Sequence, residues 1–269
     1  MPIFISLILG VIEGLTEYLP VSSTGHLIVA ERALGLGKSE ASDAFAIVVQ
    51  FGAILAVAVQ YRALLLGLAR GLAERRPDSL RLLGALAIGF VPVAVIGKLA
   101  GKAIKSHLFG TTPVAIALIA GGLIMIVSER VRAARKITGR DGLEHVTAKR
   151  ALIIGAGQCF ALVPGTSRSM ATILAGQLAG LSTRTAAEFS FLLGLPTLGA
   201  ATLYEAWKSR HVLLHDIGAE SLALGVTVSF LVAWAVIAAF VRYLTRRGLE
   251  PFGVYRVAMG ALVLWMTLR

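Results

Sequence analysis

The chain has 269 residues, of which 57% are hydrophobic and 15% are charged, and its formal net charge is +11. Soluble domains of this size have roughly 45–50% apolar and about 25% charged residues, and the mean hydropathy here is +0.80. The composition therefore excludes an ordinary soluble protein and predicts a polytopic membrane protein. Its basic residues gather in short loops between apolar runs, as the positive-inside rule and anionic headgroups require, so the charge does not indicate nucleic acid. The one cysteine, Cys159, excludes an internal disulfide.

Six apolar runs are long enough to cross a bilayer as helices, which takes about 20 residues each. In chain order they are Ala44–Gln60, Leu82–Ala100, Leu108–Val127, Thr185–Tyr204, Ala219–Val241 and Phe252–Leu268. Two further stretches, residues 2–28 and 151–178, are apolar but interrupted by proline, glycine and polar clusters. We predict that they are broken helices, which are tolerated at membrane depth only where protein or a cavity surrounds them. The first lacks the basic region of a cleavable signal peptide, so we expect it to remain in the mature protein.

The two broken stretches resemble each other in sequence. A shift of 144 positions places Pro20 on Pro164, Ser23 on Ser167 and Phe45 on Phe189. Each broken stretch is followed by three full crossings, which turns the second half upside down if the broken stretches enter and leave on one face. We therefore predict an all-α membrane protein of six transmembrane helices plus two re-entrant broken-helix segments in an inverted-topology repeat. The halves of this single membrane domain, residues 1–130 and 150–269, are joined by a basic cytoplasmic loop.

The charges of the loops predict the orientation. The loops of one predicted face hold 16 Lys and Arg residues, and those of the opposite face hold 8. The richer face, which the positive-inside rule makes cytoplasmic, comprises residues 61–81, 129–150, 179–184 and 242–251. Both termini then lie on the other side, together with residues 29–43, 98–107 and 205–218. If the broken segments were full crossings, this alternation would change.

A polar cluster interrupts the first broken stretch in "EGLTEYLPVSSTGHL". Glu13 and Glu17 share one helix face, and two such carboxylates in lipid need a cavity or a cation, unless they lie near the headgroups and are solvated. Helix capping explains one of the hydroxyls at Ser22, Ser23 and Thr24. It does not explain His26, one turn into the next helix, and we interpret His26 as a base that lets Ser23 attack a phosphorus.

The second broken stretch carries "PGTSRSMAT", in which Arg168 stands between Ser167 and Ser169. Arginine is the planar donor that suits phosphate oxygens, although a structural ion pair with Glu13 or Glu17 would also explain it. If the two tips meet, a divalent cation on the carboxylates would bind a diphosphate together with Arg168. Positive charge placed against the transferring phosphoryl group is the main source of catalysis in phosphoryl transfer. Gln50, in the next span, either lines this cavity or makes a helix–helix hydrogen bond.

The two motifs, with "AFAIVVQFGAILAVAVQYR" between them, resemble the undecaprenyl-diphosphatase family of bacitracin-resistance membrane phosphatases along essentially the whole chain. The resemblance implies hydrolysis of undecaprenyl diphosphate to the monophosphate, which recycles the lipid carrier of cell-wall synthesis. It also implies dependence on a divalent cation, Mg²⁺ or Ca²⁺, and a site that opens to the periplasmic side of the bacterial inner membrane. The partners implied are the polyprenyl diphosphate lipid and the bilayer, without nucleic acid, and a homodimer is left open.

The resemblance also implies roles for individual residues. Glu13 and Glu17 match the acidic motif, Ser23 matches the nucleophile and His26 matches its partner. The phosphate-binding positions of the second motif are matched by Ser167, Arg168 and Thr172. The motif leaves open whether Ser23 attacks or whether water attacks with Glu17 or His26 as base. One departure is Met170, where glycine is expected more often, and it bears on packing more than on chemistry.

Two alternative functions remain. A lipid flippase also uses inverted repeats with broken helices, but it needs no serine–histidine pair. The other class of membrane lipid phosphatase has the motifs K-x6-R-P, P-S-G-H and S-R-x5-H, of which the first is missing and Leu174 replaces the final histidine.

Overall fold

The computed structural model describes residues 1–36, 39–108 and 110–268, and these form helices and connecting turns with one isolated bridge between Arg140 and Leu181. Six helices within the described residues are long and apolar enough to cross a membrane. They are α3 (Glu40–Gln60), α5 (Pro77–Leu108), α6 (Thr111–Ala134), α9 (Thr183–Lys208), α11 (Ala219–Leu244) and α12 (Glu250–Leu268). The predicted all-α class and the six spans are confirmed, and each observed helix contains or closely matches its predicted apolar run.

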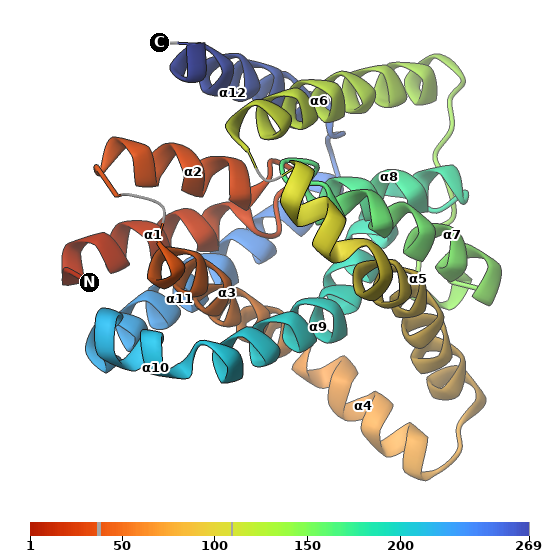
Figure 1. The fold of residues 1–269 in the computed structure, drawn as a ribbon. Coiled ribbons are helices and arrows are strands. Elements are labelled where there is room, and N and C mark those ends of the chain that lie inside the picture. The colour runs from red at the N-terminus through yellow and green to blue at the C-terminus, as the bar shows by residue number, and fades with distance from the viewer. Residues whose placement is uncertain (37–38, 109, 269) are drawn as a thin grey trace.

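Both broken stretches are helical hairpins. The first hairpin consists of α1 (Ile3–Thr16) and α2 (Ser23–Ala33), with residues 17–22 as its tip. The second consists of α7 (Ala148–Gln158) and α8 (Arg168–Leu178), and its tip, residues 159–167, begins with a 3₁₀ turn. Figure 1 shows α1 beside α2, and the contacts also join α7 to α8. The predicted breaks are confirmed, whereas re-entry into a bilayer stays a prediction.

A serine in the same unusual conformation directly precedes the second helix of each hairpin. Ser22 has φ 73° and Ser167 has φ 70°, in the left-handed region that non-glycine residues rarely adopt. Each hydroxyl accepts a hydrogen bond from a backbone N–H three residues on, which satisfies a donor that the helix leaves free. The structural counterpart of Ser167 is therefore Ser22 rather than Ser23, one residue out of step with the predicted shift.

Equivalent helices of the two halves make equivalent contacts with helices of the opposite half. The helix α11 of the second half packs on α1 and α3 of the first half, and α5 of the first half packs on α7 and α9 of the second. The helices α6 and α12 pack along each other, as do α3 and α9. A two-fold repeat produces this pattern of contacts, while its inversion across a membrane stays a prediction.

Helices also form within connections that we expected as plain loops. Residues 61–81 contain α4 (Arg62–Ala73), an amphipathic helix that buries Leu68 and exposes Leu66 and Leu72. The reason lies in its sequence, which has no proline before Pro77 and repeats leucine at helical spacing. Residues 205–218 hold the end of α9, the short α10 (Arg210–Val212) and one π turn.

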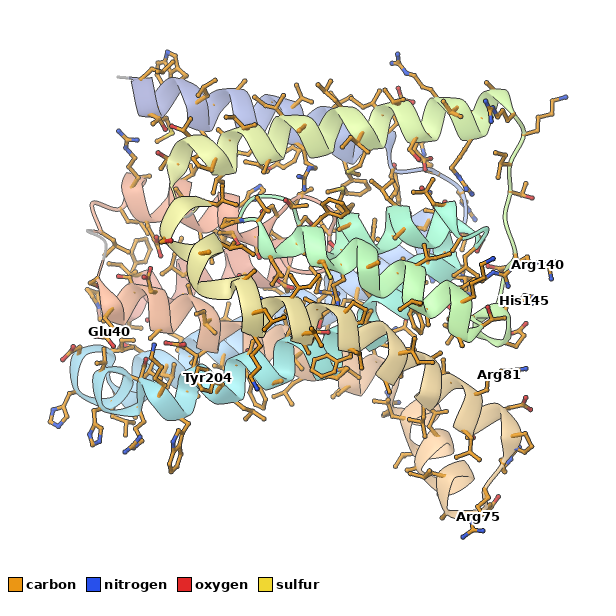
Figure 2. The ribbon with its side chains drawn as sticks, turned by 45° about the vertical axis from the view of Figure 1, so that its right-hand side comes forward. Glu40, Arg75, Arg81, Arg140, His145 and Tyr204 are labelled. Atoms are coloured by element: carbon orange, nitrogen blue, oxygen red, sulfur yellow. The ribbon has the colours of Figure 1, made fainter. Side chains whose placement is uncertain are left out.

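The two predicted sets of loops lie at opposite ends of the molecule. Figure 2 shows Arg75, Arg81 and Arg140 at one end, and Glu40 and Tyr204 at the other. The N-terminus belongs to the second end, because the Met1 ammonium donates to the carbonyls of the π turn at 3.0 and 2.9 Å. The basic and the less basic loops are thus separated in space.

Candidate active site

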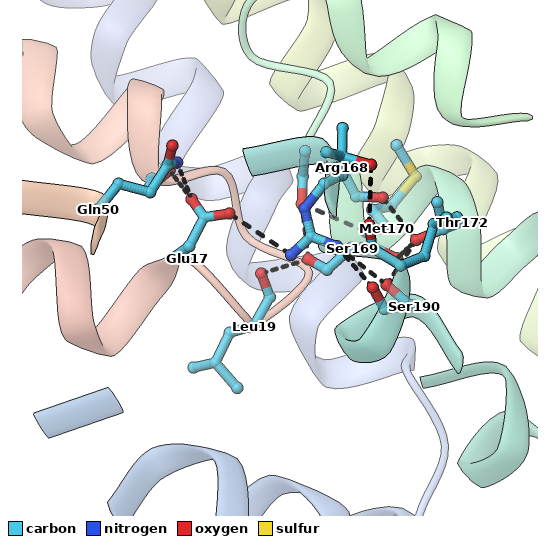
Figure 3. A network of polar contacts seen from close by, with 12 residues as sticks. Glu17, Leu19, Gln50, Arg168, Ser169, Met170, Thr172 and Ser190 are labelled. Carbon is cyan, nitrogen blue, oxygen red and sulfur yellow. Dashed lines mark hydrogen bonds and ion pairs between the residues drawn. The ribbon is translucent and has the colours of Figure 1, made fainter. Parts of the chain in front are cut away.

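The tips of the two hairpins meet. Ser169 Oγ donates to the carbonyl oxygen of Leu19 at 2.8 Å, and Arg168 Nη2 lies 3.5 Å from Glu17 Oε1. Both side chains of this ion pair are less than a tenth exposed. Figure 3 shows how the pair joins a motif from each half of the chain into one polar network.

Glu17 is the centre of that network. Its Oε2 accepts hydrogen bonds from Ser23 Oγ at 2.8 Å and from Gln50 Nε2 at 3.0 Å, while Oε1 faces Arg168. Gln50 lines the cavity described below, and its hydrogen bond joins α3 to the first hairpin tip at Glu17 rather than joining two helices.

Arg168 is held in place from α9. Its Nη1 donates to the carbonyl oxygen of Ser190 at 2.9 Å, and its Cζ lies 5.1 Å from the centre of the Tyr18 ring. Thr172 Oγ1 binds Ser190 Oγ at 2.6 Å and the carbonyl oxygen of Arg168 at 2.8 Å. Thr172 and Ser169 therefore support the arginine and the tip, and neither lines the cavity.

A cavity of about 150 Å³ lies where the tips meet. One water molecule needs roughly 10–15 Å³ of cavity volume measured in this way, so the space suits a phosphate-sized group. Gln50 and a few apolar residues line part of it. The rest is lined by polar side chains of both tips and of the first turn of each following helix, which are Glu17, Ser22, Ser23, Thr24, Ser167 and Arg168. Because α2 and α8 both begin here, their free N–H groups add positive potential for an anion.

His26 lies outside this cavity. Its Nδ1 is 2.8 Å from the carbonyl oxygen of Ser22, an acceptor only, so Nδ1 carries the hydrogen and donates. In the neutral ring Nε2 then accepts from the Tyr255 hydroxyl at 2.6 Å, and the two rings stack 5.5 Å apart. With both nitrogens engaged, the structure brings Glu17 rather than His26 to Ser23.

Glu13 is buried behind Glu17. It is 1% exposed, faces Glu17 and Gln50, and its Oε1 has no hydrogen-bond partner. Within the described residues no three side chains of His, Cys, Asp or Glu gather closely enough to hold a metal by themselves. A cation bound here would therefore have Glu13 and Glu17 as protein ligands and would need oxygens of another molecule as its remaining ligands.

We predicted no role for Ser190, Tyr255 or Arg256 from the sequence. Arg256 had a detectable signal, because it is a charged residue inside the apolar run Phe252–Leu268, and such residues face protein or a cavity. Ser190 and Tyr255 had none, since serine and tyrosine are ordinary residues of membrane helices.

The comparisons with known proteins agree along the whole chain. The profile of the family described as "Bacitracin resistance protein BacA" matches residues 6–262. A protein of Sorangium cellulosum named undecaprenyl-diphosphatase is 57% identical over 264 residues, which cover 98% of this chain and 86% of that one. Undecaprenyl-diphosphatase 2 of Rhodospirillum rubrum is 46% identical over 257 residues, covering 96% and 92% of the two chains. The undecaprenyl-diphosphatase of Sphingopyxis alaskensis is 44% identical over 261 residues, covering 97% and 96%. The chain belongs to the BacA family of bacitracin resistance proteins.

Proposed function

We propose that this multi-pass membrane protein hydrolyses undecaprenyl diphosphate to undecaprenyl phosphate and inorganic phosphate, and so recycles the lipid carrier of cell-wall polysaccharide synthesis. The proposal rests on the position of Glu17, whose carboxylate binds the hydroxyl of Ser23 and the guanidinium of Arg168 at the edge of one phosphate-sized cavity. Family membership and the names of the relatives support the choice of substrate.

Ser23 is the nucleophile in this proposal and Glu17 is its base. Ser23 Oγ attacks the terminal phosphorus and passes its proton to Glu17 Oε2, 2.8 Å away. The Oγ–P bond forms as the bond from phosphorus to the bridging oxygen breaks, and undecaprenyl phosphate leaves. Water then attacks the phosphorus of the phosphoserine and loses a proton to solvent. The Oγ–P bond breaks, Glu17 returns its proton to Ser23 Oγ, and inorganic phosphate leaves. Arg168 and the N-termini of α2 and α8 stabilise the negative charge of the transferring group.

The remaining site residues take supporting roles. Ser22, Thr24 and Ser167 contribute hydroxyls to the cavity, and Gln50 orients Glu17. Ser169 and Thr172 fix the second tip, and His26 fixes the first through Ser22 and Tyr255.

Glu13 and Glu17 are the residues that would hold a divalent cation. Mg²⁺ is commonly bound by one or two carboxylates and substrate phosphates, and the unpartnered Oε1 of Glu13 fits that use. The ion, Mg²⁺ or Ca²⁺, would supply positive charge against the diphosphate oxygens.

The proposed location is the bacterial inner membrane, with the basic end in the cytoplasm and the cavity open to the periplasmic side. The positive-inside rule supports this orientation, since Arg75, Arg81 and Arg140 lie together at one end. A homodimer stays a prediction, which the mass of the purified protein in detergent would check.

Phosphate release from a C55 prenyl diphosphate by the purified protein tests the function. We expect release with magnesium or calcium, none with EDTA, and none from Glu17→Ala or Arg168→Ala. The matched controls are Glu250→Ala and Arg130→Ala, which break an exposed ion pair of 2.9 Å on the same protein. Full activity in the controls together with loss in both site variants would place the two motifs in one catalytic site.

The variant Ser23→Ala distinguishes a lipid flippase from a phosphatase. Transport of the lipid across vesicles would survive that change, while attack by Ser23 would stop. If Ser23→Ala still releases phosphate and Glu17→Ala does not, water is the nucleophile with Glu17 as base. Wild-type protein that binds the lipid but releases no phosphate would overturn the proposal.

A further inference from the structure

Arg256 is a completely buried arginine beside the candidate active site. It lies on α12, has no exposed surface and is the largest fully buried side chain among the described residues. All its hydrogen bonds in the described structure go to carbonyl oxygens, and none goes to a carboxylate. A buried charge of this kind is costly unless it is paired, so its presence inside an apolar helix needs an explanation.

The carbonyl oxygens that Arg256 binds belong to both hairpin tips. Nη1 donates to Pro20 of the first tip at 3.3 Å, and Nη2 donates to Gly165 of the second tip at 2.9 Å. Nη2 also reaches Ala117 on α6 at 3.1 Å. Pro20 and Gly165 lie in non-helical turns, where the carbonyls lack helical partners and must find donors elsewhere. One guanidinium thus bridges two turns that are far apart in the sequence.

The neighbouring helix makes room for this guanidinium. Gly121 on α6 faces it so closely that a Cβ there would overlap Nη2 and lie 3.1 Å from Cζ. The second tip is equally close to α6, since a Cβ at Gly165 would lie 2.6 Å from the carbonyl oxygen of Val114. The preceding residue of α12, Tyr255, holds His26 of the first hairpin. Two adjacent residues of α12, Tyr255 and Arg256, therefore bind the hairpins outside the cavity.

We infer that Arg256 is a positioning residue, which clasps the two hairpin tips so that Glu17, Ser23 and Arg168 face one another. This inference rests on the proposed phosphatase activity. Arg256 does not line the cavity, so it acts through the backbone of both tips rather than on the substrate. Its planar fork spans two acceptors at fixed angles, which a lysine ammonium does not reproduce.

Kinetics of Arg256→Met, Arg256→Lys and Gly121→Ala test the inference. Misplacing reacting groups by about 1 Å can cost 10²-fold in rate, so we expect kcat of Arg256→Met to fall by about 100-fold while KM changes little. Arg256→Lys should recover only part of the rate. Gly121→Ala should lower kcat similarly, because its methyl group displaces the flexible end of Arg256 and leaves the helix backbone in place. The matched control is Gly84→Ala on α5, where a Cβ would meet nothing within 4 Å.

Thermal unfolding of each variant in detergent separates positioning from folding. Arg256→Met removes the cost of a buried charge but leaves the carbonyl oxygens of Pro20 and Gly165 without this donor. We therefore expect the variant to stay folded and to unfold at a moderately lower temperature than the wild type. Full kcat in Arg256→Met would overturn the inference, and so would unfolding of both Arg256 variants, because Arg256 would then hold the fold. A rise in KM that lysine reverses would also overturn it, since that indicates attraction of the substrate. An inactive wild type would instead refute the proposed function.

Discussion

Glu17 connects every residue that we assign to the chemical step. Its carboxylate accepts from Ser23 and Gln50 and pairs with Arg168, although all four side chains come from different helices or turns. Replacing a buried ion pair by apolar residues is often neutral or stabilising, so this pair is weak evidence for stability. Its place beside a phosphate-sized cavity indicates chemistry.

Glu17→Gln keeps the size of the side chain and removes its charge and its basicity. A general base contributes about 10²–10⁴-fold to a rate, so we expect phosphate release to fall by at least 100-fold. Steady-state release of phosphate at saturating substrate and cation measures this. Glu250→Gln is the control, since Glu250 pairs with Arg130 at the surface. Retention of more than a tenth of the activity in Glu17→Gln would contradict the role of base.

Two serines shape the hairpins at the scale of the helix. Ser22 and Ser167 each turn the chain through the left-handed region and cap the helix that follows. This conformation places Ser23 and Arg168 as the first residues of α2 and α8, facing the same cavity. The same capped turn therefore starts the second helix of each hairpin, and it is followed by Ser23 in the first hairpin and by Arg168 in the second.

Ser167→Ala and Ser167→Gly should differ in stability. Alanine keeps the left-handed strain and loses the cap, which costs about 1 kcal/mol, whereas a cap changed to glycine costs only a few tenths. Glycine also relieves the strain. We therefore expect the alanine variant to unfold at a lower temperature than the glycine variant, as measured in detergent. Equal midpoints would show that the hydroxyl and the positive φ contribute little.

The start of α9 is fastened to the connecting loop by Asp141. The carboxylate accepts hydrogen bonds from Ser182 at 2.6 Å and from Thr185 at 2.9 Å, which lower the pKa of Asp141 below its ordinary value. Because the folded pKa is the lower one, the stabilisation is present above the pKa of unfolded Asp, about 3.9. It is lost as the pH falls through the folded pKa.

Asp141→Asn should therefore lower the unfolding temperature at neutral pH and have a smaller effect near pH 3. The effect should be small, since Asp141 is exposed and solvent screens it. Unfolding midpoints of wild type and variant between pH 7 and pH 3 measure the difference. Asp78→Asn is the control, because Asp78 makes only an exposed pair with Arg81. A difference that grows toward low pH would reverse the assigned sign.

At the scale of the whole molecule, apolar runs and breaks were predictable because burial in lipid imposes them on the sequence itself. The six spans and both broken stretches followed from that reasoning, whereas an ion pair of Arg168 with Glu13 or Glu17 was only one of two interpretations of that arginine. The pairing of Ser23 with Glu17 did not follow from it, because only the turn at Ser22 decides which polar side chain faces which. Arg256 was missed although its charge stood in an apolar run, and Tyr255 depends on the packing of α12, which no local pattern encodes.

The orientation of the whole molecule is tested by two cysteines at its opposite ends. Glu40 and Arg75 are exposed and lie at the two ends, so Glu40→Cys and Arg75→Cys can be compared in a Cys159→Ala background. The positive-inside rule predicts Arg75 in the cytoplasm. A membrane-impermeant maleimide should therefore label Glu40→Cys in right-side-out vesicles and Arg75→Cys only in inside-out vesicles. The reverse pattern would place the basic end in the periplasm and turn the proposed opening of the cavity toward the cytoplasm, while labelling of both from one side would contradict the separation of the two sets of loops by a membrane.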